Sequence, residues 1–418
     1  MKYIILVGDG MADEPIPELG GKTPLEAANI PNMDRLAREG SGGLVKTVPD
    51  GLSAGSDVAI LSILGYDPRV YYTGRAPLEA ASMGIRLKEN EMGFRCNLVT
   101  VKDGKMSDFA AGHIKTEEAK GIIERLDRDL GNDKIRFYPG VSYRHLMVID
   151  SSLIPHPSSL IPHPSSLIPH PSSLIPHHSS LIPHPSSLIP HPSSLTCTPP
   201  HNITGLPYKE FLPRGEGCEL LCEIMNNSYN LLKDREQGNM VWFWGEGKAA
   251  PLPMLTERFG IRGAVISAID LVKGLGILSG LKPIDVPGAT GYYDTDYEAK
   301  ARYGLSCLKD YDLLFLHVEA PDEAGHNKDL KEKIRAIENF DEKVVGRILD
   351  GLSGDFRILI LSDHPTPISS GKHSSDPTPF AMYGKGVQPD SIQSFSEGEA
   401  KKGTFINEGF KLIERLIC

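Results

Sequence analysis

Cysteine is scarce in this chain of 418 residues, and no two cysteines have the spacing of a metal-binding or redox pair. Among the six cysteines only Cys218 and Cys222 lie close together, four residues apart, on one face of a predicted helix. Scattered thiols of this kind are typical of reduced cytoplasmic proteins and argue against a disulfide framework. The missing ligand spacing also argues against a structural zinc site.

A hydrophobic run long enough to cross a membrane is also lacking. The most apolar long stretch, residues 263–280, contains Asp270 and Lys273, which the core of a bilayer disfavours. The chain begins with a strand-like apolar run, residues 3–7, and this pattern differs from that of a secretory signal peptide. We therefore expect a cytoplasmic protein with no membrane contact.

An excess of positive charge is missing as well. The chain has 44 Lys and Arg against 54 Asp and Glu, a net charge of −10, so its surface as a whole is not suited to nucleic acid. A small anionic partner would need a locally basic pocket.

Hydrophobic residues at 40% and charged residues at 23% are typical of a globular protein, and the length allows two domains. The sequence leaves an oligomer open.

The middle of the chain is a tandem repeat. Residues 151–192 are six copies of Ser-Ser-Leu-Ile-Pro-His-Pro, and 193–195 begin a seventh; only His178 departs from the pattern. Two prolines in every seven residues exclude a helix and interrupt a strand ladder, so we predict an extended or disordered excursion. Half of the histidines lie here. A His-rich tract can bind metal, but no carboxylates accompany these histidines.

The repeat also has a genetic explanation. The heptanucleotide TCATCCC, read three times in frame, encodes the heptapeptide, so we hypothesise that a DNA microsatellite expanded within a surface loop. Loop-closure entropy rises slowly with length, so such an insertion need not unfold its host. Residues 143–149 predict a strand, and residues 195–198 resume an ordered pattern after the repeat. These flanks predict a hairpin with the repeat at its tip.

Three continuous apolar runs, residues 3–7, 313–318 and 356–361, each lead into acidic or histidine residues. Continuous runs indicate buried parallel strands, and the helical pattern of residues 330–349 lies between two of them. This alternation predicts an open α/β sheet, in which ligands bind beyond the carboxyl ends of the strands. The residues that fall there are Asp9, Asp322, His326, Asp363 and His364.

These side chains, with His373, offer the donors that divalent metals prefer. Taken alone, each has a plainer explanation, because an Asp after a strand is usually a turn or helix-cap residue and His373 would be a loop histidine. Together, carboxylates and imidazoles suit Mn²⁺, Zn²⁺ or Mg²⁺, with Co²⁺ as a further candidate. Two such ions about 4 Å apart form the usual clamp for in-line phosphoryl displacement.

Ser56 is the candidate nucleophile of such a reaction. It stands at the predicted start of a helix, where an anion is favoured, and Gly55 permits a close approach. The alternative is that Ser56 merely caps the helix, and Asp57 in the first turn fits either interpretation.

These motifs together resemble the archaeal-type 2,3-bisphosphoglycerate-independent phosphoglycerate mutases of the alkaline phosphatase superfamily, over nearly the whole chain outside the repeat. The segments that carry the resemblance are Val7-Gly8-Asp9-Gly10-Met11-Ala12-Asp13, Gly55-Ser56-Asp57-Val58-Ala59, Leu64-Gly65-Tyr66-Asp67-Pro68, Ala110-Ala111-Gly112-His113-Ile114, Tyr143-Arg144-His145-Leu146, Thr196-Cys197-Thr198-Pro199-Pro200-His201, residues 317–326, residues 362–367 and His373.

The resemblance implies an alkaline-phosphatase-like core, residues 1–72 and 239–418, with a mostly parallel sheet flanked by helices. A smaller α/β transferase domain, residues 73–238, would be inserted in it and would carry the repeat, residues 151–195. One metal site would use Asp9, Asp363, His364 and Ser56, and the other Asp322, His326 and His373. Substrate contacts would come from Arg95, His113, Arg144, Lys248 and Lys273, with Lys273 also catalytic.

The implied activity is an isomerase that interconverts 3-phosphoglycerate and 2-phosphoglycerate in glycolysis and gluconeogenesis. Ser56 would carry the phosphoryl group between two divalent metals, and no bisphosphoglycerate would be needed. The glycerate would reorient in a closed, water-excluding cleft. A metal-dependent phosphatase or another phosphomutase on the same core is the first alternative, because the metal ligands serve any phosphoryl transfer. A non-catalytic scaffold that binds partners through its Pro-rich repeat is the second.

Overall fold

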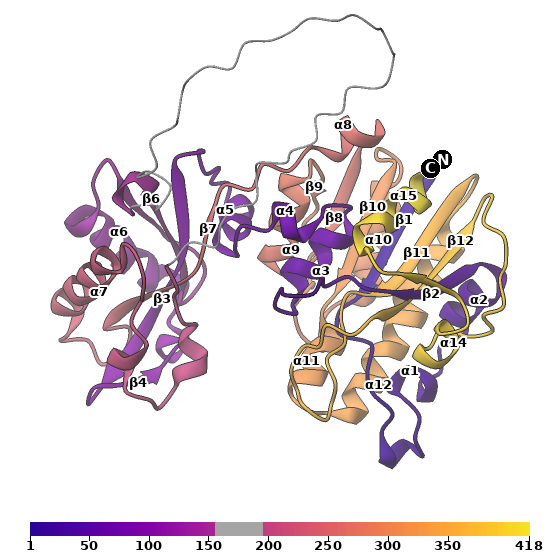
Figure 1. The fold of residues 1–418 in the computed structure, drawn as a ribbon, viewed down its shortest axis with the longest axis horizontal. Helices are drawn as coiled ribbons and strands as arrows, with labels where there is room; N and C mark the ends of the chain where they lie inside the picture. Colours follow the sequence, from indigo (N-terminus) through magenta and orange to yellow (C-terminus); the bar gives the residue numbers. More distant parts are fainter. Residues whose placement is uncertain (155–194) are drawn as a thin grey trace, which may run out of the picture. The chain divides into compact units, whose positions relative to one another are not determined.

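The structure is a computed structural model and describes residues 1–154 and 195–418. Most of the predicted repeat, with its histidines, lies outside the described residues. The described residues form two compact units, the first comprising residues 1–87 and 247–418 and the second residues 88–246 (Figure 1). The first unit extends beyond the boundary expected at residue 72, because helix α5 (Ala76–Ser82) packs against helix α9 (Asp270–Leu278). A Cβ on Gly274 of α9 would lie 1.8 Å from the Leu78 carbonyl oxygen, so the two helices touch backbone to backbone.

The first unit is built on an eight-stranded sheet in the order β13-β2-β12-β11-β1-β10-β8-β9. The central strands β11, β1, β10 and β8 are parallel, and β12 runs antiparallel to both of its neighbours. The strands are β1 (Lys2–Gly8), β2 (Ser41–Val45), β8 (Gly263–Ile266), β9 (Lys282–Pro283), β10 (Leu313–Val318), β11 (Phe356–Ser362), β12 (Thr378–Gly384) and β13 (Thr404–Ile406). The three predicted parallel strands are therefore confirmed, and they are adjacent.

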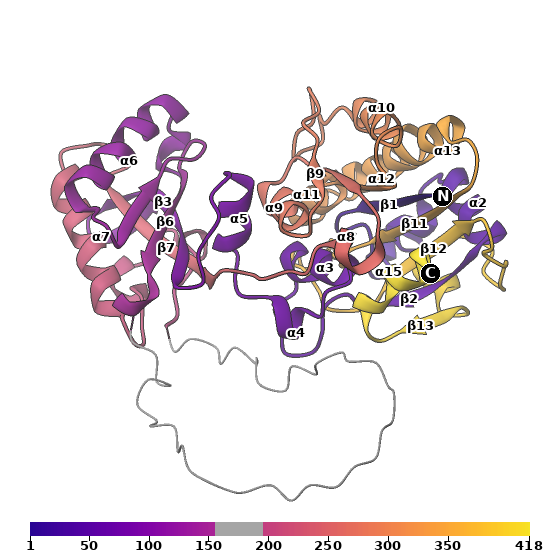
Figure 2. The same cartoon turned by 90° about the horizontal axis from the view of Figure 1, so that it is seen from above.

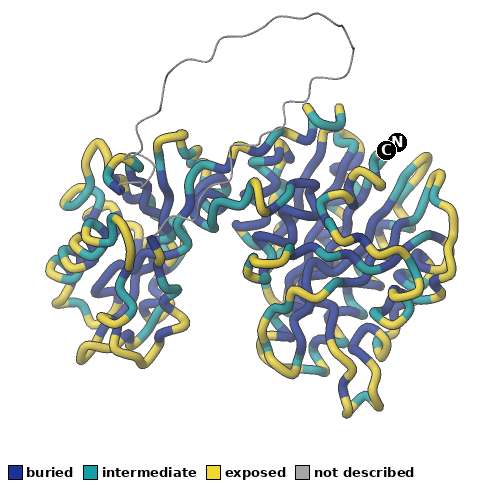
Figure 3. The backbone as a smooth tube through the Cα atoms, viewed as in Figure 1, coloured by how far each residue is buried: buried dark blue, intermediate teal, exposed yellow. Residues whose placement is uncertain are grey.

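Both faces of this sheet are buried, and for that reason its central strands are continuously apolar. Successive residues of β1 point to opposite faces, so that Ile4 and Leu6 join one hydrophobic cluster while Ile5 and Val7 join another. Figure 2 shows helices on both faces of the sheet, and Figure 3 shows the buried centre. The remaining helices are α1 (Pro24–Ala27), α2 (Pro31–Glu39), α3 (Ser56–Ile63), α4 (Pro68–Tyr71), α8 (Leu255–Phe259), α10 (Tyr297–Cys307), α11 (Ala320–His326), α12 (Leu330–Asn339), α13 (Arg347–Gly351), α14 (Glu397–Ala400) and α15 (Leu412–Ile417).

The helix predicted over residues 330–349 is present, but it is not uniform. It consists of α12, a π-helical turn over Phe340–Gly346, and α13. The π turn places the Asp341 carboxylate against the start of α2, where it accepts hydrogen bonds from the backbone N–H groups of Asn32 and Met33, the latter at 2.7 Å. The N-cap residue of α2 is Ile30, whose side chain cannot accept a hydrogen bond, so Asp341 caps the helix in its place.

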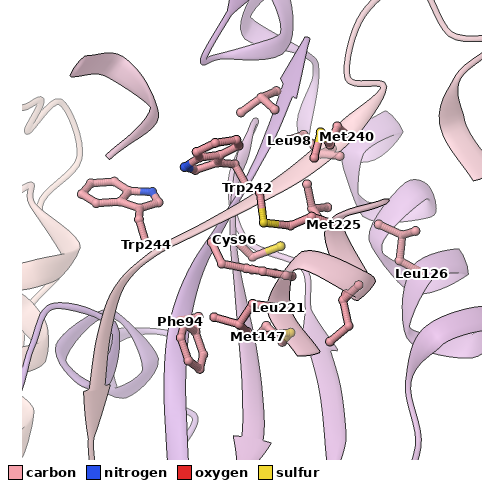
Figure 4. Packing of buried hydrophobic residues seen from close by; sticks show 14 of the residues in the cluster. Phe94, Cys96, Leu98, Leu126, Met147, Leu221, Met225, Met240, Trp242 and Trp244 are labelled. Carbon is pink, nitrogen blue, oxygen red and sulfur yellow. The ribbon is translucent and has the colours of Figure 1, made fainter. Parts of the chain in front are cut away.

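The second unit is a smaller α/β body. Its five-stranded sheet has the order β4-β3-β6-β5, with β7 paired to β3. Buried side chains of this sheet and of two helices form one core, in which Phe94, Met147 and Trp242 are almost fully enclosed (Figure 4). The elements are β3 (Glu91–Lys102), β4 (Lys105–Asp108), β5 (Ile135–Tyr138), β6 (Arg144–Asp150), β7 (Met240–Lys248), α6 (Thr116–Leu130) and α7 (Cys218–Leu232).

The described residues beside the repeat are anchored in that core, but they do not form the expected hairpin. Ile154 and Leu195 are 5% and 3% exposed and belong to the same cluster. After the repeat, Thr196 bridges to Arg214 and not to β6. The hairpin prediction was wrong because both edges of β6 are already occupied, by β3 and β5.

None of the helices in residues 1–154 and 195–418 combines the length and apolar character needed to span a bilayer.

Candidate active site

The candidate ligands lie at one edge of the large sheet because three parallel strands end in register. Gly8 at the end of β1 pairs with Val318 of β10 on one side and with Ser362 of β11 on the other. Asp9 and Asp363 are the next residues of their strands, and Asp322 follows β10 within one helical turn. The carboxyl edge of the sheet therefore collects the predicted side chains.

Ser56 faces the first group of these residues. Its Oγ lies 3.4 Å from both carboxylate oxygens of Asp9 and 3.2 Å from Nε2 of His364. The same Nε2 lies 3.5 Å from Asp9 Oδ1 and 3.4 Å from Asp363 Oδ2. Gly55 is the N-cap residue of α3, and Ser56 is its first helical residue. Since the Ser56 hydroxyl points to the ligands, its alternative role as a helix cap is wrong.

The second group surrounds Asp322. His326 Nε2 lies 3.2 Å from Asp322 Oδ2, and His373 Nε2 lies 3.4 Å from Asp322 Oδ1. The two imidazole Nε2 atoms are 2.9 Å apart. His326 reaches Asp322 because residues four apart share one face of α11, whereas His373 comes from the loop between β11 and β12. Short distances among three donor atoms of this type suit a cation.

Two sets of three residues in the described part of the chain bring their donor atoms within 4.8 Å of one another. One is Asp322, His364 and His373, and the other is Asp9, His317 and Asp363. Among described residues, Asp363 Oδ2 and His317 Nε2 are buried and have no hydrogen-bond partner. Buried polar atoms are costly unless they are satisfied, and a divalent ion would satisfy both. The residues thus fit a metal centre.

The electrostatics of the cluster agree with that fit. Burial, and then the nearby carboxylates of Asp363 and Asp322, raise the pKa of Asp9 well above its ordinary value. Burial opposes ionisation of Asp322, but hydrogen bonds with His326 and His373 outweigh it and lower the Asp322 pKa well below its usual range. The contact with Asp322 raises the pKa of His326 to about 9. Crowded buried carboxylates of this kind are stabilised in their charged form by a cation.

The polar neighbours of the ligands also hold them in place. Asp363 Oδ1 accepts the backbone N–H of Gly10 at 3.1 Å and that of His364 at 2.8 Å. The Thr366 hydroxyl donates to Asp322. Such contacts fix the direction in which each carboxylate presents its free oxygen.

Asp57 anchors the start of α3. Its buried carboxylate accepts hydrogen bonds from Tyr72 and from Arg75 Nε, the latter at 2.8 Å. Burial opposes its charge, but Arg75 and Tyr72 outweigh burial and lower the Asp57 pKa. Asp57 is therefore a fixed charge that holds the turn of Ser56.

The predicted substrate residues fall in both units. Arg95, His113 and Arg144 are in the second unit, and Lys248 and Lys273 are in the first. The Arg95 guanidinium stacks 3.8 Å from the Trp244 ring, and Arg144 lies 4.6 Å from the Tyr143 ring. His113 has φ of 53° in a short turn whose Ala110 and Gly112 N–H groups bond to Asp108. Lys273 Nζ lies 3.0 Å from Asp285 Oδ1.

His317 is the residue of the site that sequence reasoning missed. It is fully buried in β10, and its Nε2 lies 3.3 Å from Asp9 Oδ2. Burial lowers its pKa, but the carboxylates of Asp9 and Glu319 outweigh burial and raise it to about 10. The signal was present, because His317 is the one polar residue within an otherwise apolar buried strand.

A serine hydroxyl that faces clustered carboxylates and imidazoles, at the carboxyl edge of a parallel-rich sheet, is an arrangement suited to metal-assisted phosphoryl transfer. Comparison with known proteins specifies the family. A family profile described as 2,3-bisphosphoglycerate-independent phosphoglycerate mutase matches residues 37–237. A protein of that description from Methanothrix thermoacetophila is 47% identical over 100% of both chains. One from Methanosarcina barkeri is 45% identical over 97% of this chain and 96% of its own.

Solved structures show the same fold. A protein from Pyrococcus horikoshii aligns with a TM-score of 0.76 and 30% identity, over 99% of this chain and 96% of its own. A cofactor-independent phosphoglycerate mutase from Thermoplasma acidophilum aligns with a TM-score of 0.63 and 23% identity, over 100% and 99%. The chain belongs to the family of 2,3-bisphosphoglycerate-independent phosphoglycerate mutases, which are isomerases.

Proposed function

We propose that this chain interconverts 3-phosphoglycerate and 2-phosphoglycerate through a phosphoserine at Ser56, without bisphosphoglycerate. One observation carries the proposal. In a chain that shares 47% of its residues with a family member over the full length, the Ser56 hydroxyl lies 3.2–3.4 Å from Asp9 and His364. We place the reaction in cytoplasmic glycolysis and gluconeogenesis, with small phosphorylated acids as partners.

The donor set favours two divalent ions, Mn²⁺ ahead of Zn²⁺, Mg²⁺ or Co²⁺. When bound, they stabilise the Ser56 alkoxide and neutralise charge on the phosphoryl group. The residues that would hold one ion are Asp9, Ser56, Asp363 and His364, and those for the other are Asp322, His326 and His373. Two observations support this assignment: both sets lie at one sheet edge, and the first includes Asp363 Oδ2, a buried atom without a hydrogen-bond partner in the described chain.

The chain's own residues carry out two transfers. Ser56 Oγ gives up its proton and attacks the phosphorus of 3-phosphoglycerate, the bond from phosphorus to the 3-oxygen breaks, the 3-oxygen takes up a proton, and glycerate remains bound. The 2-hydroxyl of glycerate then attacks the phosphorus of the phosphoserine and gives up its proton, the bond from phosphorus to Ser56 Oγ breaks, and Ser56 Oγ takes up a proton. The start of α3, which begins at Ser56, would support the phosphoryl group in both steps, because the free N–H groups of a helix N-terminus favour an anion.

We propose that Arg95, His113, Arg144, Lys248 and Lys273 bind the glycerate carboxylate and the phosphoryl oxygens, with Lys273 also acting in catalysis. The second unit, which carries three of them, would be the transferase domain of an alkaline-phosphatase-like core. The alternative function, a metal-dependent phosphatase or another phosphomutase, is less well supported, because a phosphatase releases its alcohol product and has no need for a clamp on it. Stacking on Trp244 and Tyr143 holds two of these cations in the second unit.

The test is an assay of the full chain with Mn²⁺ and 3-phosphoglycerate, without bisphosphoglycerate, that follows 2-phosphoglycerate and free phosphate together. Ser56→Ala should abolish both products, with a fall in kcat of about 10⁴-fold or more, as is usual when a nucleophile is removed. Ser62→Ala is the matched control, because Ser62 lies in the same helix and is fully buried. It should retain activity.

Phosphate release without 2-phosphoglycerate would favour a phosphatase. A variant with residues 155–194 replaced by a short Gly-Ser linker would then be measured, because it keeps Ile154 and Leu195 in the core. Formation of 2-phosphoglycerate by that variant would show that the chain is a mutase whose transfer to glycerate the repeat obstructs. If neither form makes 2-phosphoglycerate, or if Ser56→Ala remains active, the proposal is wrong.

A further inference from the structure

His317 is buried beside the two carboxylates of the Ser56 centre. Its side chain is 0% exposed, and Nε2 lies 3.3 Å from Asp9 Oδ2. This contact is not aligned as a hydrogen bond, and Nε2 has no hydrogen-bond partner elsewhere among residues 1–154 and 195–418. Asp363 Oδ2 is also buried and has no hydrogen-bond partner among the described residues. A ring nitrogen and a carboxylate oxygen, each without a hydrogen-bond partner in the described chain, therefore belong to the same group of side chains.

The spacing of these atoms fits ligation by one ion. The donor atoms of Asp9, His317 and Asp363 all lie within 4.8 Å of one another. With metal–ligand bonds of about 2.1 Å, two ligands of one ion lie up to roughly 4.2 Å apart, and the 3.3 Å between His317 Nε2 and Asp9 Oδ2 is within that limit. Orphaned buried polar atoms are rare in native proteins and commonly mark a missing water or ion. An ion at this place would satisfy both.

The opposite side of the His317 ring is held firmly. Nδ1 lies 3.4 Å from Glu319 Oε1, and that oxygen accepts hydrogen bonds from Ser267 Oγ at 2.8 Å and from the Ala268 N–H at 2.7 Å. The buried Lys300 ammonium donates to Glu319 and to the His317 carbonyl oxygen. A carboxylate behind the second ring nitrogen is the usual support of a metal-ligating histidine.

We propose that His317 is a ligand of the ion held by Asp9 and Asp363, and that Glu319 fixes the direction of its ring. His364 is near both sets of ligands. Its donor nitrogen lies within 4.8 Å of those of Asp322 and His373, and His364 Nε2 is also 3.5 Å from Asp9 Oδ1. His317 belongs to the Asp9 group alone. The inference rests on the proposed two-metal centre and adds a fixed nitrogen ligand to it.

The test compares Mn²⁺ binding to the full-length wild type, His317→Gln and His145→Gln by titration calorimetry. His145 is the control because it is also a buried histidine, in the second unit, with an Nε2 that has no hydrogen-bond partner in the described chain. Wild type and His145→Gln should bind two Mn²⁺ ions alike. His317→Gln should lose affinity at one of them by about tenfold or more. The visible absorption spectrum of the Co²⁺ form should change as well, because a nitrogen ligand is lost.

A measurement on the wild type avoids any folding defect of the variant. In the Co²⁺ form, proton NMR should show one more strongly shifted, slowly exchanging imidazole N–H signal than His326, His364 and His373 account for. Unchanged Mn²⁺ affinities in His317→Gln would overturn the inference while leaving the mutase intact. Weaker affinity with an unchanged Co²⁺ spectrum would also overturn direct ligation. A wild type that binds no Mn²⁺ would instead overturn the proposed function.

Discussion

Gly10 shows how closely single residues are fitted around the candidate metal ligands. It has φ of 60°, and a Cβ there would lie 2.5 Å from Asp322 Oδ1 and 2.8 Å from the Asp322 Cα. Gly20 also has positive φ, 68°, but a Cβ there would meet nothing within 4 Å. The two glycines share the backbone requirement and differ only in what surrounds them.

We therefore expect Gly10→Ala to weaken Mn²⁺ binding and Gly20→Ala to leave it unchanged. Each substitution should cost about 1 kcal/mol through the left-handed backbone, but only the first displaces Asp322. Calorimetric titration with Mn²⁺ and denaturant unfolding measure the two effects separately. Equal Mn²⁺ affinities in the two variants would show that the Asp322 carboxylate tolerates a methyl group at residue 10.

At the scale of elements, helix α12 joins two loops that carry candidate ligands. Its Lys333 is fully buried, and Nζ donates to Asp13 Oδ2 at 2.7 Å, to the Thr366 carbonyl at 2.8 Å and to the Ala12 carbonyl at 3.3 Å. Ala12 and Asp13 follow β1, and Thr366 follows β11. Burial lowers the pKa of Lys333, so the ammonium depends on these acceptors for its charge.

Lys333→Met should destabilise the protein by about 3–5 kcal/mol, because the buried Asp13 carboxylate would lose its cation. Lys331→Met is the matched control, since Lys331 is exposed on the same helix. It should change the free energy of unfolding by less than about 0.5 kcal/mol. Urea unfolding measures both. A loss in Lys333→Met as small as that in the control would mean that the two loops are held by other contacts.

At the scale of the whole molecule, the two units have separate hydrophobic cores, and every candidate metal ligand lies in the first. The chain's two tryptophans, Trp242 and Trp244, lie in the second unit. Tryptophan emission therefore reports on one unit, while far-ultraviolet circular dichroism reports on both.

Removal of metal by a chelator should destabilise the first unit alone. Mn²⁺ at 100 times its Kd stabilises a folded unit by about 2.7 kcal/mol for each site. We expect Mn²⁺ to raise the thermal midpoint seen by circular dichroism and to leave the midpoint of tryptophan emission in place. Equal shifts in both signals would show that the units unfold together.

The sequence alone determined the strands at the centre of the first unit and the side chains at their ends. Burial on both faces makes β1, β10 and β11 continuously apolar, and parallel strands end at one edge, so the pattern by itself groups Asp9 with Asp322 and Asp363. The start of α3 at Ser56 was equally visible, because Gly55 precedes it and the turn that begins a helix is a local property.

Tertiary structure decided what depends on contacts between residues far apart in the chain. The assignment of α5 to the first unit, the occupied edges of β6 and the Asp341 cap on α2 all arise from non-local packing, which no local pattern encodes. His317 was visible in the sequence as a polar residue within an apolar strand, but its contact with Asp9 forms only when β1 and β10 pair. Periodicity records which face of an element is buried, whereas only folding decides which residue lies against it.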